Sequence, residues 1–554
     1  MASVPTGGGL CPYGWVTRPY GQGACPYGVR TWQPCSKNVS GQIIIKLSAE
    51  IKSWIKVSIM SLNFWVIIHF IALSGLVLYG LHRIWILYHW FSEKKKYAPE
   101  LPPDFYFKEN DCPFVTVQLP LYNERFVAER LIDAAANLDW PGKRLEIQVL
   151  DDSTDDTPGI VEKRVAYWAV NGVVISVVRR TNREGYKAGA LDNGMKTCSG
   201  EFIAIFDADF VPPRDFLFRT ISFFADKKTG MVQARWGFLN TEHSWLTSVQ
   251  ALLLGPHFRI EHWVRHRRGL FFNFNGTAGV WRRTAIESAG GWQADTVTED
   301  LDLSYRAQMA GWKFRYVDEL EVPSELPVRL SAFRCQQQRW AKGSVQTAKK
   351  ILPLLLKRNF PPAVKLEALA HLLANVCWLL GVIVTLTLYP TILSRTNIGP
   401  YQIFRIDAPI FILSSMAIFL YFVLYRRGQN KKIPLSTLLM MPVFTIGLAP
   451  GIALSVIKGI FRNGGIFDRT PKFGINGKEK LPRMAFLYSQ RSMPYVIMNL
   501  ILFCYTLLPV YFALQRETWI AIPFLLVFPM GFFFVMCKDV KEIFENYFSK
   551  TSGI

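Results

Sequence analysis

Two carboxylates that directly follow an apolar run are the residues best suited to chemistry in this chain. Asp207 and Asp209 are separated by one alanine, and residues 202–206 before them are all apolar, which is typical of a buried strand. Carboxylate oxygens suit Mg²⁺ or Mn²⁺, and Mg²⁺ usually binds through one or two carboxylates together with phosphate oxygens. Such an ion acts as a Lewis acid on a departing diphosphate. The pair therefore predicts a divalent-cation site for a nucleoside diphosphate.

A second acidic motif, Thr298-Glu299-Asp300, offers a proton acceptor. An inverting transfer needs one carboxylate to remove the proton from the acceptor hydroxyl as that hydroxyl attacks. We assign this role to Asp300, with Glu299 and Asp302 as neighbours that could be mistaken for it. Acidic residues also favour the first turn of a helix through the macrodipole, so the motif alone leaves a structural role open.

A third motif, Gln336-Gln-Gln-Arg339-Trp340, combines amides, a guanidinium and an indole. Arg339 can donate two parallel hydrogen bonds to phosphate oxygens. Trp340 offers a flat apolar face to a sugar ring, although a tryptophan in such a helix is also a common membrane anchor. The neighbouring Gln336 and Arg339 favour the sugar-binding interpretation.

Further candidates follow the predicted strands. Asp151 and Asp152 come at a strand end and are expected to contact the nucleoside, although Asp-Asp-Ser is also a good turn sequence. Tyr122 and Glu124 follow an earlier strand, where a base or ribose could lie. Lys187 lies at the start of a predicted helix among small residues, which suits a diphosphate near a helix N-terminus.

The elements that position these residues alternate in type between residues 97 and 330. Short β-rich runs cover residues 114–119, 145–150, 173–178 and 202–206, and helical segments cover residues 125–136, 157–170 and 186–196. Such alternation predicts an α/β domain, with a mostly parallel sheet and helices on both faces. Ligands of such sheets bind at the carboxyl ends of the strands, where Asp151 and Asp207 fall.

Long apolar runs bracket this domain. Hydrophobic residues make up 50% of the chain, and the runs that approach the ~20 residues needed to cross a bilayer are 64–81, 366–393, 408–425, 494–514 and 519–537. Residues 435–460 are equally apolar but contain Pro442 and Pro450, so we expect that segment to be interfacial or re-entrant. The net charge of +21 is concentrated beside the spans, for example at residues 94–96, which favours a cytoplasmic catalytic domain and no nucleic acid partner.

The sequence therefore divides into five parts. A disordered segment at 1–42 precedes an interfacial helix and the first transmembrane helix at 43–92. The catalytic domain at 97–330 is inserted before an interfacial helix at 331–360 that carries the Gln-Arg-Trp motif. A transmembrane region at 361–554 follows.

Together these motifs resemble those of processive family 2 glycosyltransferases of the cellulose synthase superfamily, which have a GT-A catalytic fold. Residues 271–282 and 311–327 resemble the cellulose synthase-like A and C branches, which make mannan or glucomannan and xyloglucan-type backbones. Residues 467–472 match the family's F-x-x-T-x-K gating loop, placed here at 462–480. The resemblance implies that Asp300 is the base and that Asp207 and Asp209 bind metal. It implies substrate contacts for Asp151, Asp152, Lys187, Asp207, Gln336, Arg339, Trp340, Thr470 and Lys472. From their positions in the sequence we add Tyr122, Glu124 and Glu299 to the expected substrate-binding residues.

We therefore expect an inverting, processive synthase that uses Mg²⁺ or Mn²⁺, extends a β-linked polysaccharide and passes it through the lipid bilayer. UDP-glucose is the first expected donor. The alternatives are a mannan or glucomannan synthase that uses GDP-mannose, and a non-processive glycolipid glucosyltransferase. The expected location is a multi-pass protein of the bacterial cytoplasmic membrane, or of a Golgi membrane in a eukaryote, with room for accessory export subunits.

Overall fold

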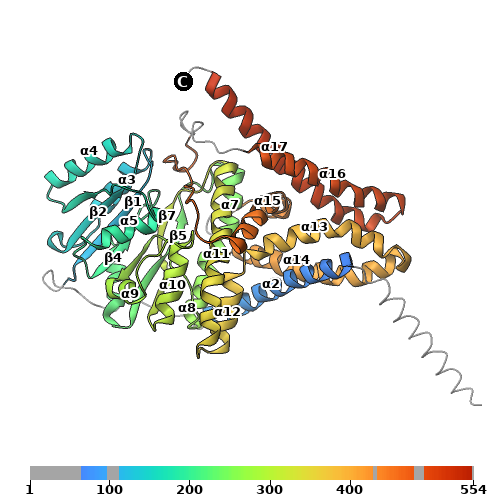
Figure 1. Cartoon of the computed structure of the whole chain (residues 1–554), viewed down its shortest axis with the longest axis horizontal. Helices are drawn as coiled ribbons and strands as arrows, with labels where there is room; N and C mark the ends of the chain where they lie inside the picture. Colours follow the sequence, from blue (N-terminus) through green and yellow to red (C-terminus); the bar gives the residue numbers. More distant parts are fainter. Residues whose placement is uncertain (1–63, 96–111, 428–432, 480–491, 552–554) are drawn as a thin grey trace, which may run out of the picture. The chain divides into compact units, whose positions relative to one another are not determined.

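The computed structural model describes residues 64–95, 112–427, 433–479 and 492–551 (Figure 1). The chain divides into two compact units, Met1–Ser61 and Leu62–Ile554, and every described residue belongs to the second. The predicted disordered segment at 1–42 and the interfacial helix that precedes the first span therefore lie outside the described residues.

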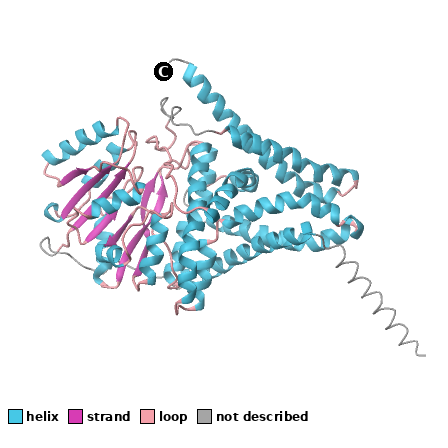
Figure 2. Ribbon diagram, viewed as in Figure 1, coloured by secondary structure: helices cyan, strands magenta, loops and turns pink. Residues whose placement is uncertain are grey.

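A seven-stranded sheet forms the centre of a domain that lies at one end of the bundle of long helices (Figure 2). Its order is β3-β2-β1-β4-β6-β5-β7, and only β6 runs antiparallel to its neighbours. The predicted α/β GT-A fold with a mostly parallel sheet is thus confirmed. The strands are β1 (Val115–Leu121), β2 (Leu145–Asp151), β3 (Ile175–Val178), β4 (Phe202–Ile205), β5 (Thr229–Phe238), β6 (Gly279–Arg282) and β7 (Lys313–Ser324).

Helices cover both faces of this sheet because its strands are apolar on both sides. In β4, Phe202 and Ala204 belong to one buried cluster, whereas Ile203 and Ile205 belong to another, as the two-residue period of a strand requires. The first cluster includes residues of α3 (Ala128–Ala136), α4 (Thr157–Val170) and α6 (Phe216–Ile221). The second includes residues of α5 (Tyr186–Met195), α9 (Arg283–Ser288) and α10 (Glu299–Met309).

The remaining helices lead from the sheet into a bundle of long apolar helices (Figure 1). They are α2 (Phe64–Lys94), α7 (Trp245–Pro256), the π-helix η4 (His257–His262), α8 (Trp263–Arg267), α11 (Leu330–Lys357), α12 (Pro362–Leu372), α13 (Val376–Ser394), α14 (Pro400–Arg427), α15 (Leu435–Phe461), α16 (Met493–Gln515) and α17 (Ile522–Thr551). Short 3₁₀ segments lie at Gly142–Arg144, Ser222–Ala225, Thr396–Ile398 and Trp519–Ala521.

Within the described residues, five helices are long and apolar enough to cross a membrane. They are Phe64–Lys94, Val376–Ser394, Leu435–Phe461, Met493–Gln515 and Trp519–Phe548. The predicted span at 366–393 is divided, because α12 ends at Leu372 and α13 begins at Val376. The predicted span at 408–425 lies inside α14.

Helix α15 is continuous although the sequence suggested that its prolines interrupt it. Pro442 and Pro450 both lie inside this 27-residue helix. Its length and composition would allow a crossing, but α15 also runs beside α11 over much of its length. Phe444 stacks near Phe333 at 6.1 Å, and a Cβ at Gly459 would lie 2.7 Å from the carbonyl oxygen of Lys342. The interfacial or re-entrant position that we expected for residues 435–460 stays a prediction, because α15 is also one of the five helices long and apolar enough to cross a membrane.

A buried group of four charges joins the sheet domain to the long helices. Glu261 of η4 forms ion pairs with Arg83 of α2 and, at 3.0 Å, with Arg265 of α8. Arg265 also contacts Glu367 of α12 at 2.8 Å, and Glu367 lies 2.8 Å from His82. All four charged side chains are at most 7% exposed. We call Arg83, Glu261, Arg265 and Glu367 the junction cluster.

Candidate active site

The parallel strands bring the predicted site residues to one edge of the sheet. Leu121 at the end of β1 is in register with Asp151 at the end of β2, and β4 pairs with β1 on its other side. The residues that follow these strand ends therefore lie at the same carboxyl edge, as we expected from the sequence. The edge includes Tyr122, Glu124, Asp151, Asp152, Asp207 and Asp209.

Lys187 contacts the first carboxylate of the Asp-Ala-Asp motif. Its Nζ lies 2.5 Å from Oδ1 of Asp207 and donates a 2.8 Å hydrogen bond to the carbonyl oxygen of Gly276. Burial by itself lowers the pKa of Lys187, but Asp207 and Glu299 outweigh burial, and the pKa is raised. Lys187 therefore stays charged and provides a fixed cation between Asp207 and the loop before β6.

Asp300 lies in the first turn of α10 and beside that same loop. Its Oδ1 accepts a 2.8 Å hydrogen bond from the amide of Leu301. Gly276 has a φ of +80°, and a Cβ at that position would lie 2.9 Å from Oδ2 of Asp300. Burial first, and then the neighbouring Glu299, raise the pKa of Asp300 to about 7, while Lys187 opposes the rise. A carboxylate that titrates near neutral pH suits a general base.

The neighbouring Asp302 has different surroundings. It is fully buried, and its two oxygens contact Lys350 at 2.9 Å and Arg306 at 2.7 Å. The pair with Lys350 joins α10 to α11, and the pair with Arg306 lies within α10. Asp302 is thus a structural residue, which removes one of the two neighbours that the sequence could have confused with Asp300.

The two acids at the end of β2 face arginines of the adjacent strand end. Arg180 donates to both oxygens of Asp152, at 2.8 Å and 2.5 Å, and Arg179 lies 3.3 Å from Asp151. Neither arginine was among the predicted site residues. Their position directly after β3 was the available signal, because β3 ends at the same edge of the sheet. The predicted nucleoside contacts of Asp151 and Asp152 stay predictions.

The predicted gating loop lies over the carboxyl edge of the sheet. Nζ of Lys472 contacts Oδ2 of Asp209 at 2.7 Å. Arg469 forms an ion pair of 3.2 Å with Glu124 and donates to the carbonyl oxygen of Asn123. Burial raises the pKa of Glu124 to about 8, although Arg469 opposes the rise. The loop thus brings two cations to the acidic edge.

The Gln-Arg-Trp motif faces this loop and a large cavity. The guanidinium of Arg339 lies 4.3 Å from the centre of the Phe467 ring, and Trp340 lines the cavity. Gln336 is buried, and its Oε1 has no hydrogen-bond partner. Thr470 is also buried, and its hydroxyl is likewise unpaired. Both are polar groups that a ligand could satisfy.

Asp207 and Asp209 have the chemistry for a cation that arrives with a diphosphate. Among the described residues, no group of three or more His, Cys, Asp or Glu side chains forms a ready-made metal site. The lysine contacts use one oxygen of each carboxylate, Oδ1 of Asp207 and Oδ2 of Asp209. Two carboxylates that complete their shell with phosphate oxygens and water are a normal ligand set for Mg²⁺. The residues present therefore fit such an ion.

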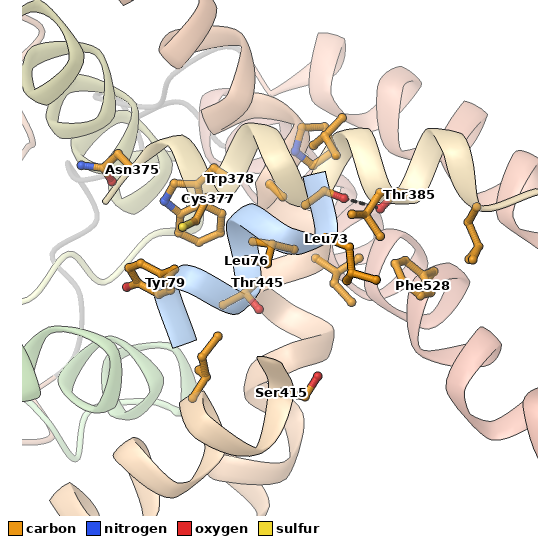
Figure 3. Close-up of a pocket in the computed structure, with 18 of the residues that line it drawn as sticks. Leu73, Leu76, Tyr79, Asn375, Cys377, Trp378, Thr385, Ser415, Thr445 and Phe528 are labelled. Atoms are coloured by element: carbon orange, nitrogen blue, oxygen red, sulfur yellow. Dashed lines mark hydrogen bonds between the residues drawn. The ribbon is translucent and has the colours of Figure 1, made fainter. Parts of the chain in front are cut away.

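The cavity beside Asp300 has a volume of about 1380 Å³ and continues between the long helices. Figure 3 shows part of its lining, with Leu73, Leu76 and Tyr79 of α2 and with Trp378 of α13 and Phe528 of α17. Hydroxyl groups are spaced along this mainly apolar wall. They belong to Thr385, Ser415 and Thr445, from α13, α14 and α15. At the far end the lining includes Trp519 and Phe524.

Comparison with known proteins gives the family. Residues 116–287 match Glycosyl transferase family 2, and residues 202–426 match Glycosyl transferase family group 2. Glucomannan 4-beta-mannosyltransferase 7 of Arabidopsis thaliana is 36% identical over 408 residues, which are 71% of this chain and 71% of that relative. The chain belongs to glycosyltransferase family 2. The predicted resemblance to the processive members of the cellulose synthase superfamily is thus confirmed.

A second relative and one solved structure are also similar to this chain. Glucomannan 4-beta-mannosyltransferase 9 of Arabidopsis thaliana is 42% identical over 315 residues, which are 56% of this chain but only 59% of that relative's length. Among solved structures, the mannosyltransferase PcManGT from Pyrobaculum calidifontis, in complex with GDP-Man and Mn²⁺, is 22% identical. That match covers 71% of this chain and 99% of that chain, with a TM-score of 0.48.

Proposed function

We propose that this family 2 glycosyltransferase is a membrane-embedded, inverting and processive synthase of a β-linked polysaccharide. The observation that carries the proposal is the position of Asp300. Its carboxylate lies beside Lys187 and Asp207 at the sheet edge, and it also lines the cavity between the long helices. One residue therefore faces both the expected donor site and the expected path of the product.

In this mechanism Asp300 takes the proton of the acceptor hydroxyl. The hydroxyl oxygen forms a bond to the anomeric carbon of the donor sugar, and the bond from that carbon to the diphosphate oxygen breaks on the opposite side. The nucleoside diphosphate leaves with the electron pair, and the configuration of the anomeric carbon is inverted. Because the pKa of Asp300 is about 7, its carboxylate is available to accept a proton near neutral pH.

The charge that develops on the leaving group needs cations around it. Lys187 forms an ion pair with Asp207, and Lys472 forms one with Asp209. The guanidinium of Arg339 lies over the ring of Phe467 in the gating loop. A divalent cation bound by Asp207 and Asp209 would supply Lewis-acid stabilisation of the diphosphate. Trp340 then holds the acceptor sugar at the entrance of the cavity, which gives the chain a route away from the site.

We expect GDP-mannose rather than UDP-glucose as the donor. The sequence motifs gave UDP-glucose first, but two relatives that are 36% and 42% identical are named as glucomannan 4-beta-mannosyltransferases, which supports the alternative. Those relatives come from plants, so we also favour a Golgi membrane over a bacterial one. A non-processive glycolipid glucosyltransferase fits less well, because it has no need of a long lined cavity.

The test is a direct comparison of donors with the full chain in lipid nanodiscs. Radiolabelled GDP-mannose and UDP-glucose are supplied in parallel, with Asp300→Asn as the control for background. We expect an insoluble, mannanase-sensitive product from GDP-mannose. A labelled glycolipid that carries a single sugar would contradict processive synthesis. Incorporation of label from UDP-glucose but not from GDP-mannose would contradict the proposed donor.

A further inference from the structure

A buried carboxylate that was not among the predicted site residues contacts the gating loop. Glu325 follows the last residue of β7 and is 2% exposed. Its Oε1 accepts a hydrogen bond of 2.9 Å from the amide of Phe473. Its Oε2 accepts bonds of 2.8 Å and 3.1 Å from the amides of Gly474 and Ile475. Three consecutive backbone amides of the loop thus point at one carboxylate.

The loop conformation that produces this arrangement depends on Gly474. Its φ of +75° lies in the left-handed region, which turns successive amides toward one point. A Cβ at this position would lie 2.9 Å from the carbonyl oxygen of Phe126. Glycine is therefore required both by the backbone angle and by the close approach of the neighbouring loop.

The backbone of Glu325 is connected to the acidic motif as well. Its amide donates a 3.1 Å hydrogen bond to Oδ2 of Asp209, and its carbonyl oxygen accepts one from Nζ of Lys472. The same Nζ contacts Oδ2 of Asp209. Glu325 therefore contacts the loop through its side chain and its carbonyl group, and contacts the cation-binding carboxylate through its amide.

Among the described residues, this part of the loop also makes apolar contacts and one contact with an arginine. Phe473 and Ile475 form a small apolar cluster with Phe126 and Val328, separate from the main core. Arg130 lies 3.9 Å from Oε2 of Glu325 and 3.4 Å from the carbonyl oxygen of Gly474. Charged acceptors make the stronger hydrogen bonds, so the three bonds to Glu325 are the main polar attachment of residues 473–475.

We propose that Glu325 is the latch that holds residues 467–475 over the sheet edge and thereby positions Lys472 on Asp209. The proposal rests on the proposed function, because the closed loop covers the edge where the donor would bind. Exchange of a spent nucleotide for a new donor then requires the three amides to leave Glu325. Glu325 is a positioning residue, since it acts through Lys472 and makes no contact with the reacting atoms.

The test measures the loop directly by hydrogen–deuterium exchange on the full chain in nanodiscs. In Glu325→Gln one acceptor oxygen and the charge are lost, while the size of the side chain is kept. We expect exchange in a peptide covering residues 470–479 to be at least tenfold faster than in the wild type, with exchange in β2 unchanged. In the donor assay we expect a donor KM raised several-fold, with a smaller change in kcat.

Glu321→Gln is the matched control. Glu321 lies on the same strand with a side chain that is 48% exposed, and it pairs with Arg235 rather than with the loop. The same change of charge there is expected to leave exchange of residues 470–479 as in the wild type. Equal acceleration in both variants, or wild-type protection in Glu325→Gln, would overturn the latch.

Two further outcomes keep the test decisive. If Glu325→Gln does not fold, Gly474→Ala changes the loop side of the same attachment and leaves the buried acid intact. It should also accelerate exchange, and undisturbed protection in that variant would count against the latch. If the wild type transfers neither sugar, the proposed function fails, whereas the exchange result still decides the role of Glu325.

Discussion

Replacement of Asp300 by asparagine tests the central chemical assignment. The change keeps the shape of the side chain and its contact with the amide of Leu301, but it removes the proton acceptor. Burial raises the pKa of Asp300 from 3.8 to about 7, so the folded protein holds its proton more tightly than the unfolded chain does. The protonated Asp300 side chain therefore contributes to the free energy of unfolding. This contribution is fully present below about pH 3.8 and is lost as the pH rises through about 7. The uncharged asparagine avoids this loss, so we expect an unchanged or higher Tm at pH 8.

The kinetic effect follows from the same surroundings. General base catalysis contributes about 10²- to 10⁴-fold, so transfer by Asp300→Asn should fall by that factor. In the wild type, kcat/KM should fall about tenfold per pH unit below about pH 7, because only the ionised carboxylate accepts the proton. The variant should lack this pH dependence.

The assay is release of nucleoside diphosphate from pH 5.5 to 8.5, together with donor binding and thermal unfolding of both proteins. Donor binding should survive in Asp300→Asn, since the side chain faces the acceptor. Turnover within threefold of the wild type, or a loss of turnover that accompanies a lowered Tm, would refute the assignment of the base.

Three other perturbations examine neighbouring parts of the site. Gly276→Ala should lower kcat at least tenfold, because its Cβ would lie 2.9 Å from Oδ2 of Asp300; wild-type turnover would contradict the tight fit there. Trp340→Ala should shorten the product more than it slows nucleotide release, and products of normal length on sizing gels would argue against an acceptor contact. Excess EDTA should abolish transfer and Mn²⁺ or Mg²⁺ should restore it, whereas full activity in chelator would mean that Lys187 and Lys472 suffice without a metal.

The order of the elements and the edge that carries the site could be predicted from the sequence. The β-rich runs predicted at 114–119, 145–150, 173–178 and 202–206 correspond to β1 to β4, and the helix predicted at 157–170 matches α4 (Thr157–Val170). Local patterning is sufficient there, because each element buries its own apolar residues. Asp207 and Asp300 could be selected for the same reason, since each follows a clear structural boundary.

The partners of these residues could not be predicted, because they come from distant parts of the chain. Lys472 reaches Asp209 across 263 positions, whereas Arg180 directly follows β3 and could have been selected by its place at the sheet edge. In the sequence, Glu325 appeared only as one residue of the longer run at 311–327 that resembles the family. Its contact with three backbone amides could not be predicted, because every residue type except proline has a backbone amide. The predicted interruption of residues 435–460 at Pro442 and Pro450 was wrong for a related reason. Packing of α15 against α11 can outweigh the local free-energy cost of a proline within a helix.

The junction cluster has a practical consequence for recombinant work. A fragment cut at residues 97–330 would retain Glu261 and Arg265 but discard Arg83 and Glu367, so each retained charge would lose a counterion. The retained Glu261–Arg265 pair and the apolar surface that α2 covers would then be exposed to water. Expression trials should therefore keep the flanking helices, and homologous enzymes are better exchanged as whole chains than as swapped sheet domains.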